Sequence, residues 1–305
     1  MNGVKVGIIG IGNMGSAHLR MITGGNIPDM TVTAVCDIDT EKLNAARNTY
    51  PALRVFEDYT DLLKNSDTNA VIIAVPHPLH AKIAIEAFKY GKHVLVEKPL
   101  DITVSAAEDL CAAAEKSGKV FAIMFNQRTN GLFRKAREIV KSGELGEIKR
   151  SVWIITNWYR TQSYYDSSKW RATWAGEGGG VLLNQAPHNL DIWQWICGSP
   201  SAVTAFCSVG KFHNIEVEDE ATIYAEYENG ATGVFITSTG DCPGTNRLEI
   251  TGTRGKTVLE NGILKLWKLN EDERDICKNA TEGFVSPETE YSEFSAGREE
   301  AHAGI

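Results

Sequence analysis

The stretch VKVGIIGIGNMG at residues 4–15 decides how this chain begins to fold. An apolar run turns at Gly10 and continues into a helical pattern, which predicts a buried strand, a tight turn and a helix. Gly10 would make the turn, Gly12 would let a phosphate approach the backbone, and Gly15 would let the helix pack on the strand. The N–H groups of such a turn and the positive end of the helix dipole favour a pyrophosphate. The stretch, including Asn13 and Met14, therefore predicts a dinucleotide site.

An acidic residue supports this interpretation, because a glycine-rich turn alone also occurs for structural reasons. Asp37 closes the next apolar run and lies 22 residues after Gly15, close to the spacing at which a carboxylate reaches the adenosine ribose. Asp37 would also repel a 2′-phosphate, and residues 38–40 contain no arginine to accept one. The spacing therefore predicts NAD as the cofactor in preference to NADP.

Composition excludes several classes of protein. The chain has 305 residues, 43% of them hydrophobic, and a formal charge of −8 without a basic stripe, so nucleic acid is not an expected partner. No apolar stretch is long enough to cross a bilayer, and the first residues already form the predicted strand, so a cytoplasmic location is expected. The six cysteines are scattered without metal-ligand spacing, which predicts reduced thiols and no metal site.

The pattern changes near residue 125. Before it, five strand-like runs near 4–9, 31–36, 70–75, 93–96 and 119–123 alternate with helical segments, which predicts a doubly wound parallel sheet over 1–125. After it come a helix near 130–142, a strand-like run at 147–158, a polar aromatic loop, a helix near 181–196 and six further strand-like runs. Residues 126–305 are therefore expected to form an α+β domain with a mostly antiparallel sheet.

A strand that ends in Glu97-Lys98-Pro99 carries the first candidate catalytic residue. Ligands of open parallel sheets lie beyond the carboxyl ends of the strands, so Lys98 is expected to face the nicotinamide and to orient or polarise a substrate hydroxyl. The structural alternative is a solvated lysine at a strand end. Three neighbours of this edge are also assigned to the cofactor site, with capping as the alternative for the histidine: Pro76, His80 and Glu97.

A second group of polar residues follows a run of three glycines at 178–180. If residues 181–196 are helical, Asn184, His188 and Asp191 share one face. His188 would then take the hydroxyl proton, oriented by Asp191 or another acceptor, and the glycines would let the helix approach the cofactor. The alternative is a buried histidine satisfied by Asp191. Pro187 indicates a kink or a later helix start.

These motifs, in this order, resemble the Gfo/Idh/MocA oxidoreductases, the glucose-fructose oxidoreductase and inositol dehydrogenase family. The resemblance covers nearly the whole chain and implies a Rossmann domain, a second domain whose open sheet often makes oligomer contacts, and NAD(P)-linked oxidation of sugars or cyclic polyols. It also implies Lys98 and His188 as the catalytic pair. Asn184 stands where inositol dehydrogenase-like members carry an aspartate, which puts the proton relay and the substrate in question. The family usually continues past a helix expected from Glu299, so a truncation at Ile305 is expected.

Aromatic and basic residues are candidates for sugar recognition. Stacking faces and hydrogen-bond donors suited to a sugar come from Arg128, Trp158, Tyr159 and Arg171, with plain packing as the alternative. The chain is thus expected to be a dehydrogenase acting on a secondary alcohol of a sugar or polyol, as a homodimer or homotetramer. Two alternatives remain open: a glycoside hydrolase or lyase that retains NAD for a transient oxidation, and a non-catalytic sensor of NAD or sugar.

Overall fold

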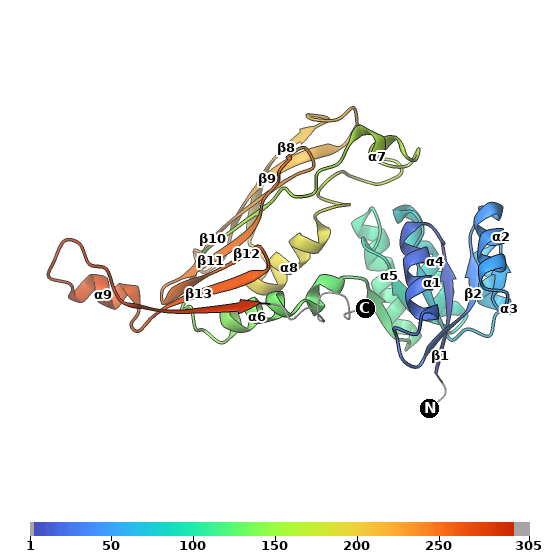
Figure 1. The fold of residues 1–305 in the computed structure, drawn as a ribbon, viewed down its shortest axis with the longest axis horizontal. Coiled ribbons are helices and arrows are strands. Elements are labelled where there is room, and N and C mark those ends of the chain that lie inside the picture. Colours follow the sequence, from blue (N-terminus) through green and yellow to red (C-terminus); the bar gives the residue numbers. More distant parts are fainter. Residues whose placement is uncertain (1–2, 296–305) are drawn as a thin grey trace. The chain divides into compact units, whose positions relative to one another are not determined.

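The computed structural model describes residues 3–295 and divides the chain into two compact units (Figure 1). The first unit contains residues 1–124 and 175–178, and the second contains residues 125–174 and 179–305. The short segment 175–178 was expected in the second domain. It belongs to the first unit, where the Nδ1 atom of His77 lies 2.9 Å from the carbonyl oxygen of Glu177. The helix expected from Glu299 lies outside the described residues.

The first unit is a parallel sheet flanked by helices. Its strand order is β3-β2-β1-β4-β5-β6, which confirms the predicted doubly wound sheet. The elements are β1 Val4–Ile9, α1 Asn13–Thr23, β2 Met30–Cys36, α2 Thr40–Thr49, β3 Arg54–Phe56, α3 Tyr59–Asn65, β4 Ala70–Ile73, the 3₁₀ turn η1 His77–Leu79, α4 His80–Lys89, β5 His93–Val96, α5 Val104–Ser117 and β6 Phe121–Ile123.

Local sequence explains these boundaries. Asp39, Asp58 and Thr103 each accept backbone N–H groups at the start of a helix, as N-cap side chains do. The four middle strands bury aliphatic side chains on both faces, as strands of a parallel sheet covered by helices must. Strand β3 and helix α3 were not expected, because three and seven residues are too short to show a clear period.

The second unit is a mixed sheet with helices on one face. Its order is β14-β13-β12-β11-β7-β10-β9-β8, and every pair is antiparallel except β10 with β7. The elements are the 3₁₀ turn η2 Asn126–Thr129, α6 Gly131–Lys141, β7 Ile148–Ile155, α7 Gln162–Asp166, α8 Pro187–Cys197, β8 Ala202–Val209, β9 Glu218–Glu226, β10 Thr232–Ser238, β11 Asn246–Gly252, β12 Gly255–Glu260, β13 Ile263–Leu269, α9 Glu273–Asn279 and β14 Thr289–Ser295. The predicted α+β class is confirmed.

Helices α6 and α8 cover one face of this sheet (Figure 1). Their apolar side chains pack on residues of the strands. Trp153 of β7, Trp193 of α8 and Phe235 of β10 form the aromatic centre of this core, with the Trp193 and Phe235 rings stacked 5.5 Å apart. The opposite face of the sheet carries no helix among the residues that the structure describes. Over the same residues, no helix is long and apolar enough to cross a membrane.

Candidate functional site

The glycine turn of the first unit has the geometry that the sequence predicted. Gly10 has a φ of +87°, which favours glycine, and a Cβ atom on Gly15 would lie 1.8 Å from the Gly10 carbonyl oxygen. A Cβ atom on Gly12, in contrast, would meet no atom within 4 Å. Gly10 and Gly15 are therefore required by the fold, whereas Gly12 borders open space. This is the position at which a pyrophosphate would approach the backbone.

Helix α1 starts directly after this turn and has a free anion-binding end. Gly12 is its N-cap residue, and the described structure contains no side-chain cap hydrogen bond and no acidic residue in the first turn. The first N–H groups of a helix need acceptors, and the helix dipole favours a negative one. Asn13 and Met14 form this first turn, and the Met14 side chain is 52% exposed. The arrangement fits the phosphates of NAD.

Asp37 follows β2 and its carboxylate is fixed by backbone donors. The Oδ2 atom accepts the Ile11 N–H at 2.8 Å, and the Oδ1 atom accepts the Asp39 N–H at 3.0 Å. Each carboxylate oxygen accepts about two hydrogen bonds, so both keep capacity for the ribose hydroxyls. Lys42 was not considered from the sequence, and its Nζ atom lies 3.9 Å from Asp37 Oδ1. A cation therefore stands beside the Asp37 carboxylate.

The ring of His80, assigned to the cofactor site, contacts two backbone carbonyls in this structure. The side chain is buried, with Nδ1 2.6 Å from the Pro99 carbonyl oxygen and Nε2 2.8 Å from the Val75 carbonyl oxygen. Burial lowers the pKa of His80, although both carbonyls act in the opposite direction. Both ring nitrogens are thus engaged by the protein. Pro76 is exposed and precedes η1, just after β4.

The Glu97-Lys98-Pro99 segment follows β5, and its peptide bond between Lys98 and Pro99 is cis. Glu97 is buried, and its Oε1 atom lies 2.8 Å from the Nε2 atom of His18 on α1. The other carboxylate oxygen accepts the Lys98 N–H at 3.3 Å. Both carboxylate oxygens of Glu97 therefore contact protein groups.

His18 is a residue of this edge that the sequence interpretation missed. It occupies the buried stripe of α1 together with Gly15, Leu19 and Ile22. A histidine at a position where the helical period calls for an apolar residue needs a buried partner, and that signal was available from the sequence.

In the second unit, helix α8 begins later than expected. It starts at Pro187, which occupies the first helical position, so Asn184 lies in the preceding turn and not on the helix face. The Nδ2 atom of Asn184 lies 3.5 Å from the hydroxyl oxygen of Tyr164. His188 is in the first turn of α8, and its ring packs edge-on against Phe125 at 5.9 Å. The expected common face is therefore limited to His188 and Asp191.

Asp191, expected beside His188, accepts hydrogen bonds from Arg128. Its two carboxylate oxygens accept the Nε and NH2 groups of Arg128 at 2.8 and 2.6 Å, a bidentate ion pair. The carboxylate is 8% exposed and the arginine side chain 46% exposed. Asp191 raises the pKa of the Arg128 guanidinium. Arg128, a candidate for substrate contact, thus joins η2 to α8.

The aromatic loop is organised around Tyr164, which was not among the assigned site residues. The guanidinium of Arg171 lies 4.4 Å from the centre of the Tyr164 ring and donates to the Tyr164 hydroxyl at 2.6 Å. The guanidinium of Arg160 lies 5.0 Å from the same ring. Trp158 packs against the sheet core, and Tyr159 is 47% exposed. The structure therefore brings Arg171 and Asn184 together through one phenol.

Within the glycine run at 178–180, Gly179 and Gly180 belong to the second unit and pack closely there. A Cβ atom on Gly180 would lie 1.9 Å from the Glu218 carbonyl oxygen, so this position requires glycine to pass close to β9. The Gly180 N–H also donates to Glu218 Oε2 at 2.9 Å. The close approach expected toward a cofactor is here an approach to the backbone of a strand.

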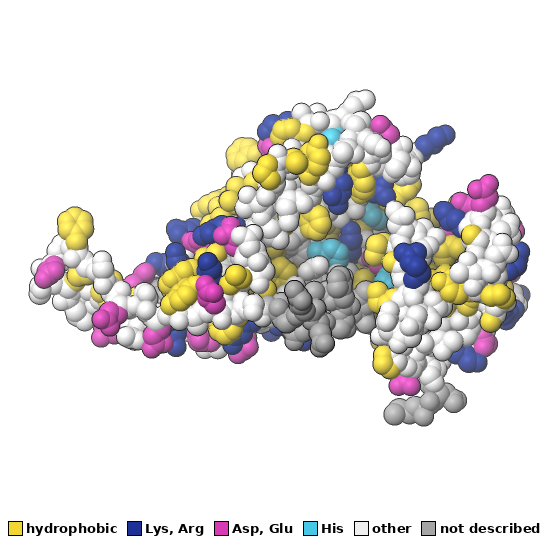
Figure 2. Space-filling model, in the orientation of Figure 1, with side chains coloured by type: hydrophobic (Ala, Val, Ile, Leu, Met, Phe, Trp, Pro, Cys, Tyr) yellow, Lys and Arg dark blue, Asp and Glu magenta, His cyan; other side chains and the backbone are white. Residues whose placement is uncertain are grey.

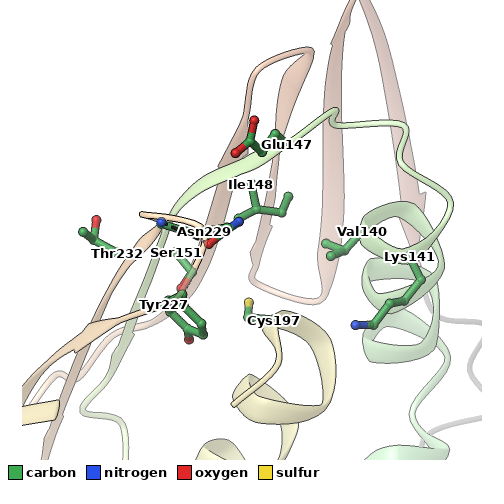
Figure 3. A pocket seen from close by; sticks show the side chains of 10 residues that line it. Val140, Lys141, Glu147, Ile148, Ser151, Cys197, Tyr227, Asn229 and Thr232 are labelled. Atoms are coloured by element: carbon green, nitrogen blue, oxygen red, sulfur yellow. Dashed lines mark hydrogen bonds between the residues drawn. The ribbon is translucent and has the colours of Figure 1, made fainter. Parts of the chain in front are cut away.

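A cavity of about 280 Å³ in the second unit contains none of the assigned residues (Figure 3). Cys197 at the end of α8, Ser151 of β7 and Tyr227 line it together with residues of α6. Burial raises the pKa values of Cys197 and Tyr227 to about 12, so both are neutral at physiological pH. In residues 3–295, no group of three or more histidine, cysteine or acidic side chains could hold a metal ion.

Comparisons with known proteins agree with this geometry. Residues 4–125 match the model of the oxidoreductase family with an NAD-binding Rossmann fold, and residues 133–258 match the Gfo/Idh/MocA C-terminal domain. A 1-carboxy-3-chloro-3,4-dihydroxycyclohexa-1,5-diene dehydrogenase from Comamonas testosteroni is 31% identical over 284 residues, covering 87% of this chain and 69% of its own. Myo-inositol 2-dehydrogenase from Thermotoga maritima is 24% identical over 266 residues, covering 85% and 75%.

A solved structure shows the same architecture. The WlbA dehydrogenase from Bordetella pertussis, in complex with NADH and UDP-GlcNAcA, superposes with a TM-score of 0.82 at 26% identity, covering 91% of this chain and 83% of that one. The family models, the relatives and the fold agree, and the chain belongs to the Gfo/Idh/MocA family as an NAD-binding oxidoreductase of the sugar and polyol dehydrogenase type.

Proposed function

We propose that this protein oxidises a secondary alcohol of a sugar, a sugar acid or a cyclic polyol with NAD. The observation that carries the proposal lies in the first unit. Gly10, Asp37 and Lys98 follow β1, β2 and β5, which are parallel strands of one sheet. The carboxyl ends of parallel strands meet at one edge, where ligands of this fold bind. A lysine at that edge stands where the reacting carbon would meet the cofactor.

The proposed roles follow from the chemistry of each side chain. NAD, when bound, accepts the hydride from the carbon that bears the hydroxyl. Lys98 donates a hydrogen bond to that hydroxyl and polarises it, and His188 accepts the hydroxyl proton, so that a ketone, NADH and a proton result. Asn184 provides an amide that orients a hydroxyl without accepting its proton. Arg128 and Asp191 hold each other, and their proposed role is to fix η2 against α8.

Two residues of the aromatic loop are proposed to recognise the substrate, and Trp158 supports them by packing on the core. Tyr159 offers an exposed ring suited to the apolar face of a sugar. Arg171 offers a guanidinium held by Tyr164, suited to hydroxyl or carboxylate oxygens. The names of the relatives suggest which compounds to test first: myo-inositol, a dihydroxylated cyclohexadiene carboxylate and a nucleotide-linked sugar acid.

The test is NADH absorbance at 340 nm with a panel of aldoses, sugar acids, inositols and these three compounds. We expect turnover that Lys98→Met and His188→Ala each lower by about 100-fold or more, with NADH affinity retained. Full activity in both variants would contradict the assigned roles. Product release without net NADH, from protein that copurifies with NAD, would instead identify the hydrolase or lyase alternative.

We also propose a homo-oligomer, a dimer or a tetramer, built on the sheet of the second unit. Support comes from one face of β8 and β9, where Phe206 and Tyr224 are 74% and 42% exposed. Figure 2 shows hydrophobic side chains gathered over the region that β8 and β9 occupy in Figure 1. Exposed apolar patches of this kind mark interaction surfaces. Light scattering of the wild type and of Phe206→Asp tests this, because a monomeric wild type would contradict it.

A further inference from the structure

Two buried histidines from different helices contact the segment that carries Lys98. His18 of α1 contacts Glu97, and His80 of α4 contacts the carbonyl of Pro99. We propose that His18 and His80 are positioning residues that hold the Glu97–Pro99 turn from both sides and thereby set the place of the Lys98 amine. This inference rests on the proposed function of Lys98, and its test is chosen so that the two can fail separately.

The contact on the Glu97 side is a buried ion pair or strong hydrogen bond. The side chains of His18 and Glu97 are 2% and 9% exposed, and Nε2 and Oε1 are 2.8 Å apart. A buried carboxylate without a partner is costly, so His18 fixes the rotamer of Glu97. The second oxygen of that carboxylate accepts the backbone N–H of Lys98. The ring of His18 thus acts on the main chain of Lys98 through one carboxylate.

The contact on the Pro99 side links two strand ends. The His80 ring lies between the carbonyl of Val75, after β4, and the carbonyl of Pro99, after β5, at 2.8 and 2.6 Å. Backbone carbonyls that leave the ladder of a sheet need other partners when they are buried. The ring contacts both carbonyls and, in its neutral form, donates its single N–H to one of them, so it spans from one strand end to the next. Lys98 therefore lies between two residues that are each anchored by a histidine.

The anchor on α1 has a further consequence for the cofactor. His18 lies five residues after Asn13, where the anion-binding end of α1 begins. A helix rises about 1.5 Å per residue, so the two positions are separated by about 7.5 Å of rigid helix. The helix that would take the phosphates of NAD is therefore tied to the turn that carries the lysine. A displacement of about 1 Å at a reacting group costs on the order of 100-fold in rate.

The first experiment compares two substitutions of His18 in the full-length protein. His18→Leu removes the hydrogen bond, whereas His18→Gln keeps an N–H donor near the position of Nε2. We expect His18→Leu to lower kcat by about 10- to 100-fold while the Kd for NADH, from nicotinamide fluorescence, changes by less than about 3-fold. We expect His18→Gln to restore most of kcat. Leu19→Ala, on the same helix, is the control for a general loss of stability and should keep kcat.

The same comparison is made at the other anchor. His80→Leu removes both contacts of the ring, and His80→Gln retains one donor, so we expect a loss of kcat that is larger for the leucine variant. If His18→Leu does not fold, Glu97→Gln takes its place, because it is nearly isosteric and weakens the same link. An unchanged kcat in His18→Leu and His80→Leu would overturn the proposal. So would a loss of kcat that is equal in His18→Leu and His18→Gln.

A second measurement needs no substrate. The acetylation rate of the Lys98 amine by acetic anhydride is measured by peptide mass spectrometry, with the exposed Lys89 as internal standard. We expect the relative rate to change by about 3-fold or more in His18→Leu and to return toward the wild-type rate in His18→Gln. An unchanged rate would overturn the positioning role. If the wild type oxidises no alcohol, the proposed function fails while this rate still decides whether the histidines place the lysine.

Discussion

In the first unit the groups that suit the cofactor are backbone features of a turn, whereas in the second unit the candidate substrate groups are side chains that hold one another. The start of α1 presents N–H groups without a side-chain cap among the described residues. Arg128 with Asp191, and Arg171 with Tyr164, are pairs in which each member fixes the other. The proposed cofactor site is thus built from main-chain geometry, whereas the candidate substrate groups are side chains that a substitution can replace.

The largest expected difference between the two units is in how much of their unfolding free energy is lost at alkaline pH. Burial raises the pKa values of Tyr165, Cys197 and Tyr227 in the second unit to about 12, and that of Cys36 in the first unit to about 12. The unfolded groups lose their protons near their ordinary values of 9.0 for cysteine and 10.0 for tyrosine. Between these ordinary values and pH 12, the unfolded state binds fewer protons than the folded state. The contribution of these groups to the unfolding free energy is therefore complete below pH 9 and is lost as the pH rises.

The second unit contains three such groups and the first unit one. Between pH 8 and pH 11, the unfolding free energy of the second unit should therefore fall by on the order of several kcal/mol more than that of the first. All seven tryptophans lie after residue 124, so their fluorescence in a urea titration reports on the second unit. Pulse proteolysis with mass-spectrometric assignment of the fragments reports on both. Tyr165→Phe should reduce the loss, since it removes one of the titrating groups. Equal losses in both units would contradict the prediction.

Two glycines give the next largest effect and test the comparison directly. Gly15→Ala and Gly180→Ala would place a methyl group 1.8 and 1.9 Å from a backbone oxygen, so each should cost about 3 kcal/mol of unfolding free energy. Gly15→Ala should also weaken NADH binding, because it displaces the start of α1, and Gly180→Ala should leave binding unchanged. Thermal unfolding and nicotinamide fluorescence measure the two effects.

Gly12→Ala is the matched control, since its methyl group would meet no protein atom within 4 Å. We expect nearly wild-type stability with NADH affinity lowered by about 10-fold or more, because the methyl group occupies the space of a phosphate. Unchanged affinity would show that the cofactor does not approach the backbone at this turn.

The third largest effect is expected on the preference of the enzyme for NAD over NADP. Asp37→Ser removes the carboxylate that repels a 2′-phosphate and leaves Lys42, 3.9 Å from that carboxylate in the wild type, to attract one. The ratio of kcat/KM for NADP to that for NAD should rise by about 10- to 100-fold. Adding Lys42→Met should remove most of the gain. A ratio that stays at the wild-type value in Asp37→Ser would exclude this carboxylate as the discriminating group.

The same comparison explains which parts of the molecule could be predicted from sequence. Gly10, Asp37 and Lys98 each close an apolar run, so strand periodicity places them at one edge before any contact is known. Arg128 and Asp191 are 63 residues apart, and no local pattern indicates that they pair. Tyr164 and Arg171 meet inside a loop without a period. The start of α8 was misjudged because apolar residues before Pro187 continue the helical pattern, although proline favours the first helical position.

The smallest effect is expected at the ion pair of the second unit. Arg128→Gln leaves the nearly buried carboxylate of Asp191 with a weaker partner, but the arginine is 46% exposed and water replaces part of the interaction. We therefore expect a loss of about 1–2 kcal/mol, measured by urea unfolding with tryptophan fluorescence. In a double-mutant cycle Asp191→Asn should recover part of this loss, because the uncompensated charge is then absent. In the first unit Lys89→Gln, which breaks an exposed pair with Glu86, should leave stability nearly unchanged. An equally small loss of unfolding free energy in Arg128→Gln would mean that this pair does not hold η2 to α8. Arg128 would then again be a candidate for substrate binding.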